Sequence, residues 1–232
     1  MHIFLNFVSY STKIVIILQK YFMGKVIAFS NQKGGSGKST LSANLAVLWS
    51  NSGYKVAVID ADPQQSLTYW LSERKKYYGA DDIGINFYSF DIRNLADEVK
   101  KIKRKYDFII IDSPPAITFE TLQIIKASNG VFVPVQPSPL DLMATLPFLQ
   151  IAREERKKPL IILNRVMPRA KLTDAMILRL RYSGAKIARS RISSKVIFAE
   201  SFAVGRGVID INVTSDAAKE IINVGNEILR NL

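Results

Sequence analysis

Short apolar runs alternate with longer amphipathic stretches along most of this chain. Six runs have the length and apolar content of strands buried on both faces of a parallel sheet, at residues 25–30, 55–60, 85–90, 107–112, 130–135 and 159–164. Apolar residues at helical spacing predict helices at 39–49, 66–76, 92–105, 119–127, 140–157 and 215–229. Ser215 is the expected N-cap of the last helix. This alternation is typical of an α/β fold with a doubly wound, mostly parallel sheet flanked by helices.

The length and composition fit one folded domain. The 232 residues are 48% hydrophobic, which is enough for a full core, and no Pro/Gly/Ser-rich tract divides them. The absence of cysteine excludes disulfide bonds, thiolate zinc sites and cysteine-held iron–sulfur clusters, and it fits a reducing cytoplasm. We therefore expect a single domain over residues 23–232.

Residues 1–22 do not follow this pattern. They are rich in apolar residues but broken by polar ones, and they lack the early positive charge and the cleavage site of a signal peptide. Met23 comes shortly before the first predicted strand. We hypothesise that the biological start is Met23 and that residues 1–22 are an extension that is not native.

A glycine-rich loop follows the first predicted strand. Its glycines let the backbone curl so that successive N–H groups point at phosphate oxygens, and the predicted helix begins directly after it. In such a loop Lys38 reaches the β- and γ-phosphates, and the Ser39 hydroxyl ligates Mg²⁺. The predicted ligand is ATP or GTP with Mg²⁺, and the expected binding residues are Lys33, Gly34, Gly35, Ser36, Gly37, Lys38, Ser39 and Thr40.

The loop departs from the general P-loop pattern at two neighbouring positions. Gln32 stands where that pattern has glycine, and a second lysine follows at Lys33. This form resembles the deviant Walker A signature of the ParA/MinD group of P-loop ATPases, which are of the SIMIBI type. The resemblance implies ATP as the nucleotide. It also implies that Lys33 is a catalytic and dimerising residue, because this lysine reaches the phosphates held by the partner subunit.

Acidic residues end two of the predicted strands. Asp112 closes an apolar run as in a Walker B motif, where a carboxylate holds Mg²⁺, and the Ser-Pro-Pro that follows is similar to the ParA pattern. The segment that contains Asp60 and Asp62 resembles the switch I motif of the family. The resemblance implies that Asp62 orients the attacking water and that Asp60 supports the water shell of the metal. The alternative is that both carboxylates cap the strand end.

Asn164 ends another predicted strand beside the expected pocket. Its side-chain amide offers a donor and an acceptor, as the edge of adenine requires. In the ParA/MinD family an asparagine at this place contacts the base, so the resemblance assigns Asn164 to ATP binding. An asparagine that caps a turn is the alternative.

The chain is strongly basic, with a formal net charge of +12, so a polyanion such as nucleic acid or an acidic membrane surface is the expected partner. We expect no membrane binding, because no run is long enough to span a bilayer and the last residues lack a basic amphipathic cluster. Cations gather instead at Arg179, Arg181, Lys186, Arg189, Arg191, Lys195 and Arg206. These residues could also form a solvated basic face without a ligand.

Residues 62–70 and 134–141 resemble the small plasmid-partition ATPases of the ParF type. The resemblance implies weak intrinsic ATPase activity, an ATP-bound homodimer, nonspecific binding to nucleoid DNA, and a ParB-like partner that stimulates hydrolysis during plasmid or chromosome segregation. The Ile-Pro-Arg-Asn motif of chromosomal relatives is absent, so the DNA contacts are assigned to Arg189, Lys195 and Arg206 without its help. Two alternatives stay open: a MinD-like positioning ATPase on a membrane surface, and an ATP-dependent metabolic ligase on the same fold.

Overall fold

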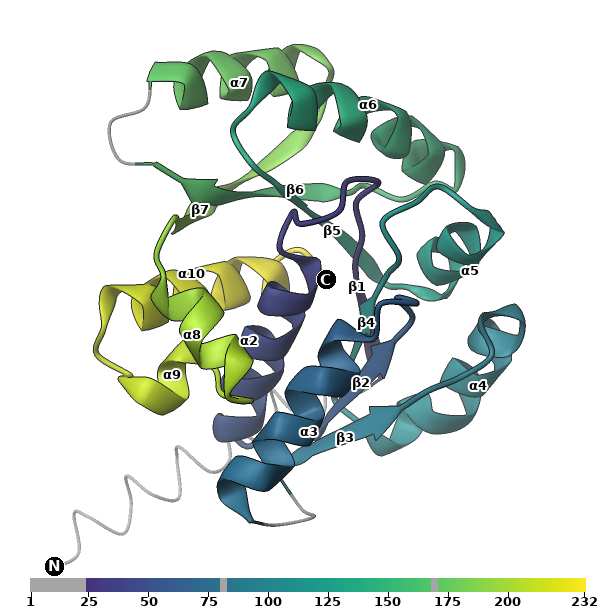
Figure 1. Cartoon of the computed structure of the whole chain (residues 1–232). Helices are drawn as coiled ribbons and strands as arrows, with labels where there is room; N and C mark the ends of the chain where they lie inside the picture. Colours follow the sequence, from purple (N-terminus) through teal and green to yellow (C-terminus); the bar gives the residue numbers. More distant parts are fainter. Residues whose placement is uncertain (1–23, 80–82, 168–170) are drawn as a thin grey trace, which may run out of the picture.

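Seven parallel strands form the centre of the structure, a computed structural model that describes residues 24–79, 83–167 and 171–232 (Figure 1). The strand order is β3-β2-β4-β1-β5-β6-β7, and every neighbouring pair is parallel. The strands are β1 Lys25–Phe29, β2 Val56–Asp60, β3 Ile85–Tyr88, β4 Phe108–Asp112, β5 Gly130–Val135, β6 Leu160–Val166 and β7 Lys186–Ser193. The predictions for residues 1–22 and Met23 lie outside the described residues.

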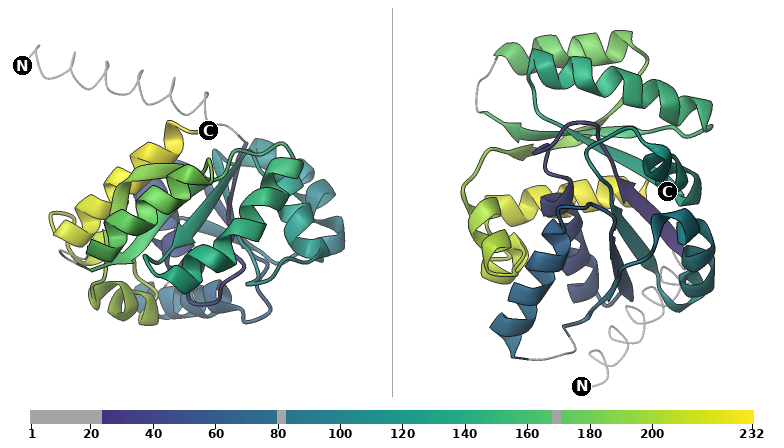
Figure 2. Two further views of the ribbon diagram at one scale, coloured as in Figure 1. Left: turned by 90° about the horizontal axis from the view of Figure 1, so that it is seen from above. Right: turned by 45° about the vertical axis from the view of Figure 1, so that its right-hand side comes forward.

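Helices cover both faces of the sheet (Figure 2). They are α2 Lys38–Asn51, α3 Ser66–Tyr78, α4 Leu95–Ile102, α5 Phe119–Ala127, α6 Pro139–Glu154, α7 Lys171–Tyr182, α8 Ile197–Ala203, α9 Val208–Ile211 and α10 Asp216–Leu229. The predicted doubly wound α/β sheet is therefore confirmed. Ser215 caps α10, with its hydroxyl accepting the N–H of Ala218 at 3.1 Å.

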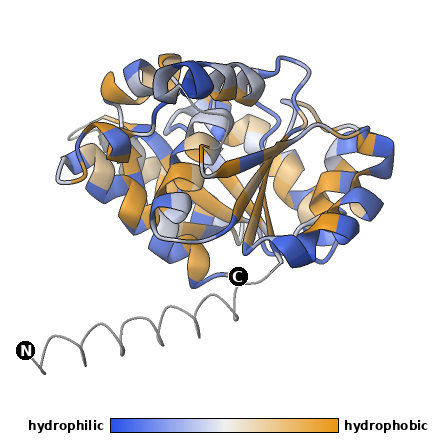
Figure 3. Ribbon diagram, turned by 90° about the horizontal axis from the view of Figure 1, so that it is seen from below, coloured by the Kyte–Doolittle hydropathy of each residue, from blue (hydrophilic) through white to orange (hydrophobic). Residues whose placement is uncertain are grey.

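Successive residues of each central strand pack on opposite faces of the sheet. In β1, Ile27 and Phe29 pack with helices α2 and α10, whereas Val26 and Ala28 pack with α4 and α5. Helices α3, α8 and α9 join the first layer, and α6 and α7 join the second. Figure 3 shows the strands as mostly hydrophobic segments between these layers. Burial on both faces explains why the sequence reads as continuous apolar runs.

The central position of β1 determines where the site forms. From β1 the chain passes to β2 and β3 on one side of the sheet, whereas β5, β6 and β7 lie on the other side, so the loop after β1 lies where the topology reverses. Asp60 of β2 is in register with Asp112 of β4, and Asp112 is in register with Phe29 at the end of β1. The glycine-rich loop and the two acidic strand ends therefore meet at one edge of the sheet.

Four elements of the structure were not predicted from the sequence, namely α7, β7, α8 and α9. Strand β7 carries charged residues in place of an apolar run, because it is an edge strand, and β6 is its one partner among the described strands. The carboxylate of Glu227 on α10 accepts the backbone N–H groups of Arg189 and Ser190, both at 2.8 Å. Helix α10 therefore supplies hydrogen-bond acceptors for part of the unpaired backbone at this sheet edge. The predicted helix at 92–105 is divided into two short 3₁₀ turns around α4.

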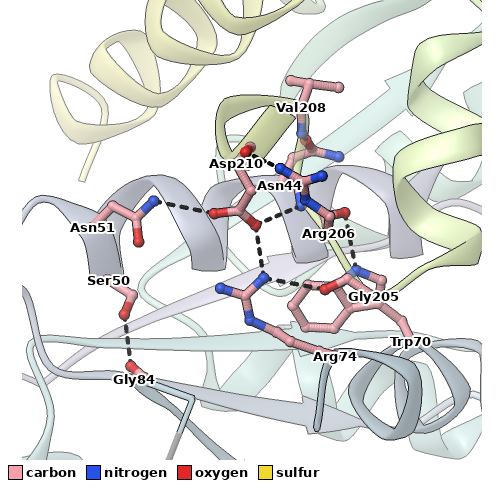
Figure 4. A network of polar contacts seen from close by, with 11 residues as sticks. Asn44, Ser50, Asn51, Trp70, Arg74, Gly84, Gly205, Arg206, Val208 and Asp210 are labelled. Carbon is pink, nitrogen blue, oxygen red and sulfur yellow. Dashed lines mark hydrogen bonds and ion pairs between the residues drawn. The ribbon is translucent and has the colours of Figure 1, made fainter. Parts of the chain in front are cut away.

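A buried polar network holds α3 against the connection between α8 and α9 (Figure 4). Arg74 Nη1 lies 2.7 Å from Asp210 Oδ2 and donates to the Gly205 carbonyl at 3.1 Å. Trp70 Nε1 donates to the Arg206 carbonyl at 3.2 Å. A Cβ on Gly205 would lie only 2.0 Å from the Arg74 nitrogen, so the two backbones are in direct contact. Because α3 follows the acidic loop, this network helps to fix the position of that loop.

Candidate nucleotide-binding site

The glycine-rich loop joins the end of β1 to the first residue of α2, as predicted. Gly35 and Gly37 have φ values of 71° and 99°, in the left-handed region that residues with a Cβ rarely adopt. Gly37 is the N-cap of α2, and no side chain caps the helix there. The N–H groups in the first turn of this 14-residue helix are therefore available to an anion such as a phosphate.

Lys38 lies between the loop backbone and the acidic strand ends. Its side chain is buried, and Nζ donates to the Lys33 carbonyl at 3.4 Å. Burial lowers the pKa of Lys38, whereas the charges of Asp112 and Asp62 raise it. Lys38 therefore interacts both with the loop backbone and, electrostatically, with the carboxylates of Asp62 and Asp112.

The buried environment of Asp112 suits a carboxylate that ligates a cation. It is fully buried, and neither carboxylate oxygen accepts a hydrogen bond of standard geometry from any residue that the structure describes. Burial raises the pKa of Asp112 to about 7, against the opposing effects of the Ser39 hydroxyl and the Lys38 ammonium. Unpaired buried carboxylate oxygens are costly, and a divalent cation would satisfy them. The residues present therefore fit Mg²⁺.

Asp60 and Asp62 organise the loop that follows β2. Asp60 accepts the N–H and the hydroxyl of Thr68 at 2.8 and 2.9 Å, and it accepts the N–H of Asp62 at 3.2 Å. Asp62 accepts the N–H of Gln64 at 2.9 Å. Asp60 thus stabilises the first turn of α3 through Thr68, a residue that sequence reasoning missed. A carboxylate with three donors suits support of a water shell better than direct metal ligation.

The protein supplies only part of a metal coordination sphere. Within the described ranges, no three Asp, Glu, His or Cys side chains group closely enough to hold a metal ion. Mg²⁺ in nucleotide sites commonly takes one or two carboxylates, with phosphate oxygens and waters as its other ligands. The predicted set of Ser39, Asp60 and Asp112 is compatible with this arrangement.

Lys33 lies at the outer side of the site, in an ion pair with α6. Its Nζ is 2.6 Å from Asp141 Oδ2, and the Lys33 side chain is 37% exposed whereas that of Asp141 is 2% exposed. The Ser138 hydroxyl also bonds Asp141 Oδ2. Sequence reasoning missed Asp141, although Ser138 and Asp141 have the spacing of an N-cap and its third helical residue.

Asn164 lies against the glycine-rich loop. Its Nδ2 donates to the Ser36 carbonyl at 2.7 Å, and its Oδ1 accepts the N–H of Arg165 at 2.9 Å. Beside it is a cavity of about 240 Å³, whose lining includes Gly37, Thr40, Asn164, Arg165, Ser194, Lys195, Val196 and Phe198. This cavity adjoins the start of α2 and has room for a base. The sequence did not predict that residues 193–196 line this cavity. They are distant from the loop in sequence, and the position of β7 in the sheet brings them close to it.

The three predicted DNA contacts have different surroundings. Lys195 forms an ion pair with Glu220 at 2.7 Å, and Arg206 bonds the Asp210 carbonyl with its guanidinium 4.9 Å from the centre of the Tyr77 ring. Arg189 is exposed on β7. It belongs to a set of exposed cations on α7 and β7 that make no ion pair with a described acid: Arg179, Arg181, Lys186, Arg189 and Arg191.

None of the described helices is both long enough and apolar enough to cross a membrane.

A strand, a glycine-rich loop and a helix, with a buried lysine and two acidic strand ends beside them, define a P-loop nucleotide-binding protein. Residues 27–208 match the CobQ/CobB/MinD/ParA nucleotide binding domain. The chain therefore belongs to this family, and the ParA/MinD resemblance inferred from the two loop lysines is confirmed.

Named relatives extend over most of the chain. Maintenance of carboxysome distribution protein A of Halothiobacillus neapolitanus is 28% identical over an alignment of 210 positions, which covers 88% of this chain and 95% of the relative. The sporulation initiation inhibitor protein Soj of Bacillus subtilis is 26% identical over an alignment of 253 positions, gaps included, which covers 90% of this chain and 100% of the relative. Members of one ATPase family thus include proteins named for different cellular processes.

Solved structures agree with the fold. The cell division ATPase MinD of Pyrococcus furiosus has a TM-score of 0.76 at 21% identity, covering 90% of this chain and 100% of MinD. An ATP complex of Cyanothece McdA has a TM-score of 0.74 at 19% identity, covering 88% of this chain and 96% of McdA. At these identities the similarity establishes the fold.

Proposed function

We propose that this protein is a ParA-like partition ATPase. In this proposal it binds ATP with Mg²⁺, forms a dimer with nucleotide between the subunits, and then binds DNA without sequence preference. It hydrolyses ATP slowly until a ParB-like partner on a plasmid or chromosome stimulates it. The protein is then cytoplasmic, and it is associated with the nucleoid when ATP is bound.

The position of Lys33 is the main support for a dimer. Lys38 already provides an ammonium group inside the loop, whereas Lys33 Nζ reaches outward to Asp141 on α6. Around it α6 exposes an apolar stripe, with Leu140 at 72% and Met143 at 69% exposure. A stripe of this kind beside a functional lysine suits contact with a second copy of the chain. In such a dimer Lys33 leaves Asp141 and contacts the partner's nucleotide.

The positions of the remaining residues support the following roles. The loop from Gly34 to Thr40 and Lys38 bind the triphosphate, and Ser39 and Asp112 hold Mg²⁺, which would neutralise phosphate charge when bound. Asp62 orients the attacking water. The cavity beside Asn164 takes the adenine.

The proposal is tested by retention on immobilised DNA with ATP, a nonhydrolysable ATP analogue or ADP, over a range of salt concentrations. We expect retention with ATP and with the analogue but not with ADP, and retention that weakens steeply with salt. Retention that is independent of nucleotide would contradict the proposal. ATP-dependent binding to anionic vesicles without DNA binding would favour the MinD-like alternative. Hydrolysis that depends on a small carboxylic acid would favour the ligase.

We predict that the exposed cations on α7 and β7 carry the DNA binding. Replacing Arg181, Arg189 and Arg191 by glutamine is expected to reduce the slope of log K against log salt by about 2 to 3, because each phosphate contact contributes about 0.9. ATP binding is expected to stay unchanged. The measurement is DNA binding by anisotropy at several salt concentrations.

Three cations at the edge of the sheet that is remote from the nucleotide site provide a matched control. Lys103, Arg104 and Lys105 are also exposed, but they lie directly before β4, at the edge of the sheet opposite the nucleotide site. Replacing these three by glutamine removes the same charge and is expected to change the slope little. Equal effects of the two triple variants would refute a specific DNA surface on α7 and β7.

We predict that Asp141 restrains Lys33 in the nucleotide-free subunit. Asp141→Asn keeps the shape of the side chain but removes its charge, so less free energy is needed to release Lys33. We expect the ATP-dependent dimer to be favoured by about 1 kcal/mol, or roughly fivefold, since a partly exposed ion pair contributes little. Sedimentation with a nonhydrolysable ATP analogue measures this shift.

Glu73→Gln is the control for the Asp141 variant, because it breaks a partly exposed ion pair, between Glu73 and Lys76 on α3, that involves no residue assigned to the nucleotide site. It is expected to leave dimerisation unchanged. Weaker dimerisation of Asp141→Asn would show that Asp141 assists Lys33 rather than restraining it.

A further inference from the structure

The side-chain amide of Asn164 contacts the backbone of the glycine-rich loop directly. Its Nδ2 lies 2.7 Å from the Ser36 carbonyl oxygen, and a Cβ on Gly37 would be only 2.0 Å from the same nitrogen. Asn164 is 5% exposed, at the end of β6, and 128 residues separate it from Ser36. The amide therefore packs directly on the peptide bond between Ser36 and Gly37.

Both ends of the amide are engaged within the chain. Oδ1 accepts the backbone N–H of Arg165 at 2.9 Å, and Arg165 has a φ of 53° in the left-handed region. A residue with a Cβ adopts this conformation at a cost, so the surrounding structure must maintain it. The amide is thus oriented by β6 and Arg165, with its NH₂ group toward the loop.

A hydrogen bond at the Ser36 carbonyl determines the direction of the next N–H group. The peptide bond is planar and trans, so its C=O and N–H point in opposite directions. If Asn164 holds the Ser36 carbonyl on one side, then the Gly37 N–H is presented on the other side. In a phosphate-binding loop, that N–H must face the ligand.

We propose that Asn164 is a positioning residue that holds the loop in its phosphate-binding shape. This inference rests on the proposed binding of ATP, and it replaces the base contact predicted from the sequence as the main role of Asn164. Loss of its amide weakens binding of every triphosphate by a similar factor, with or without a base. A residue that read adenine would affect only ligands that contain adenine.

The test compares three ligands in the full-length protein: ATP, GTP and inorganic tripolyphosphate, each with Mg²⁺, by titration calorimetry. We expect Asn164→Ala to weaken the binding of all three by about tenfold, because the Ser36 carbonyl loses its buried donor. Asn164→Asp is expected to weaken all three further, because it places a carboxylate oxygen against that carbonyl. Unchanged tripolyphosphate affinity in Asn164→Ala would overturn the proposal, whether or not ATP affinity falls.

Asn44→Ala provides the control for loss of a buried asparagine. Asn44 lies in α2, where its amide donates to the Thr40 carbonyl at 2.8 Å and accepts the N–H of Val208 at 2.9 Å. It is expected to lower the melting temperature without a common loss of affinity for the three ligands. If both variants lose affinity equally, the effect is general destabilisation and the proposal is wrong. Failure of the unmodified protein to bind ATP would instead overturn the proposed function.

Discussion

Replacing Asp62 by alanine is expected to slow ATP hydrolysis by about 10²- to 10⁴-fold while ATP binding is retained. Asp62 follows β2 and is held at the carboxyl edge of the sheet, where it interacts electrostatically with Lys38 and Asp112. It supplies no donor to the phosphates, so its removal leaves the phosphate-binding loop intact. Single-turnover phosphate release and equilibrium ATP binding measure the two effects separately.

A second variant distinguishes the chemistry of Asp62 from its structural contact. Asp62→Asn can still accept the N–H of Gln64, which the native carboxylate accepts at 2.9 Å, but it carries no negative charge. We expect it to be as slow as the alanine variant. Fast hydrolysis by Asp62→Asn would mean that Asp62 only orders its loop.

Lys38→Ala is the complementary control, because it removes the buried ammonium that lies against the loop backbone. It is expected to abolish ATP binding, whereas both Asp62 variants bind ATP. Undiminished ATP affinity of Lys38→Ala would contradict the assignment of the loop. Normal phosphate release from Asp62→Ala would exclude Asp62 from the mechanism.

The parts of the site that could be predicted from the sequence are those encoded by adjacent residues. The glycines, Lys38 and Ser39 form one continuous loop, and their backbone requirements are visible in the sequence itself. Asp60 and Asp112 were found because each ends an apolar run that the sheet brings to the same edge. Six of the seven strands were predicted for the same local reason.

The parts that were missed depend on contacts between distant residues. Asp141 lies 108 residues from Lys33, and no local pattern indicates that the two side chains pair. Asn164 lies beside the predicted loop, but its hydrogen bond to Ser36 depends on the order β1-β5-β6 in the sheet, which brings the end of β6 close to that loop. Strand β7 was missed because its charged side chains resemble a solvated segment, and only the paired sheet and the carboxylates of α10 make it a strand.

Asp210→Ala is expected to lower the free energy of unfolding by about 3–5 kcal/mol, because it leaves Arg74 buried without a counter-charge. The two side chains are each 5% exposed, and they join α3 to the start of α9 (Figure 4). Asp210 also accepts the N–H of Gly207 at 3.0 Å, which would lose its partner. Thermal and denaturant unfolding measure the change, with a melting temperature lower by about 10 °C for a chain of this size.

The size of this effect follows from burial and not from the ion pair as such, and a matched pair of variants separates the two. Asp216→Ala breaks an exposed ion pair with Lys219, in which the side chains are 81% and 63% exposed, and it is expected to change stability far less. Adding Arg74→Leu to Asp210→Ala removes the unpaired charge, so part of the lost stability is expected to return. If Asp210→Ala destabilises no more than Asp216→Ala, the network does not anchor α3, and the position of the acidic loop must depend on the contacts of Asp60 with Thr68.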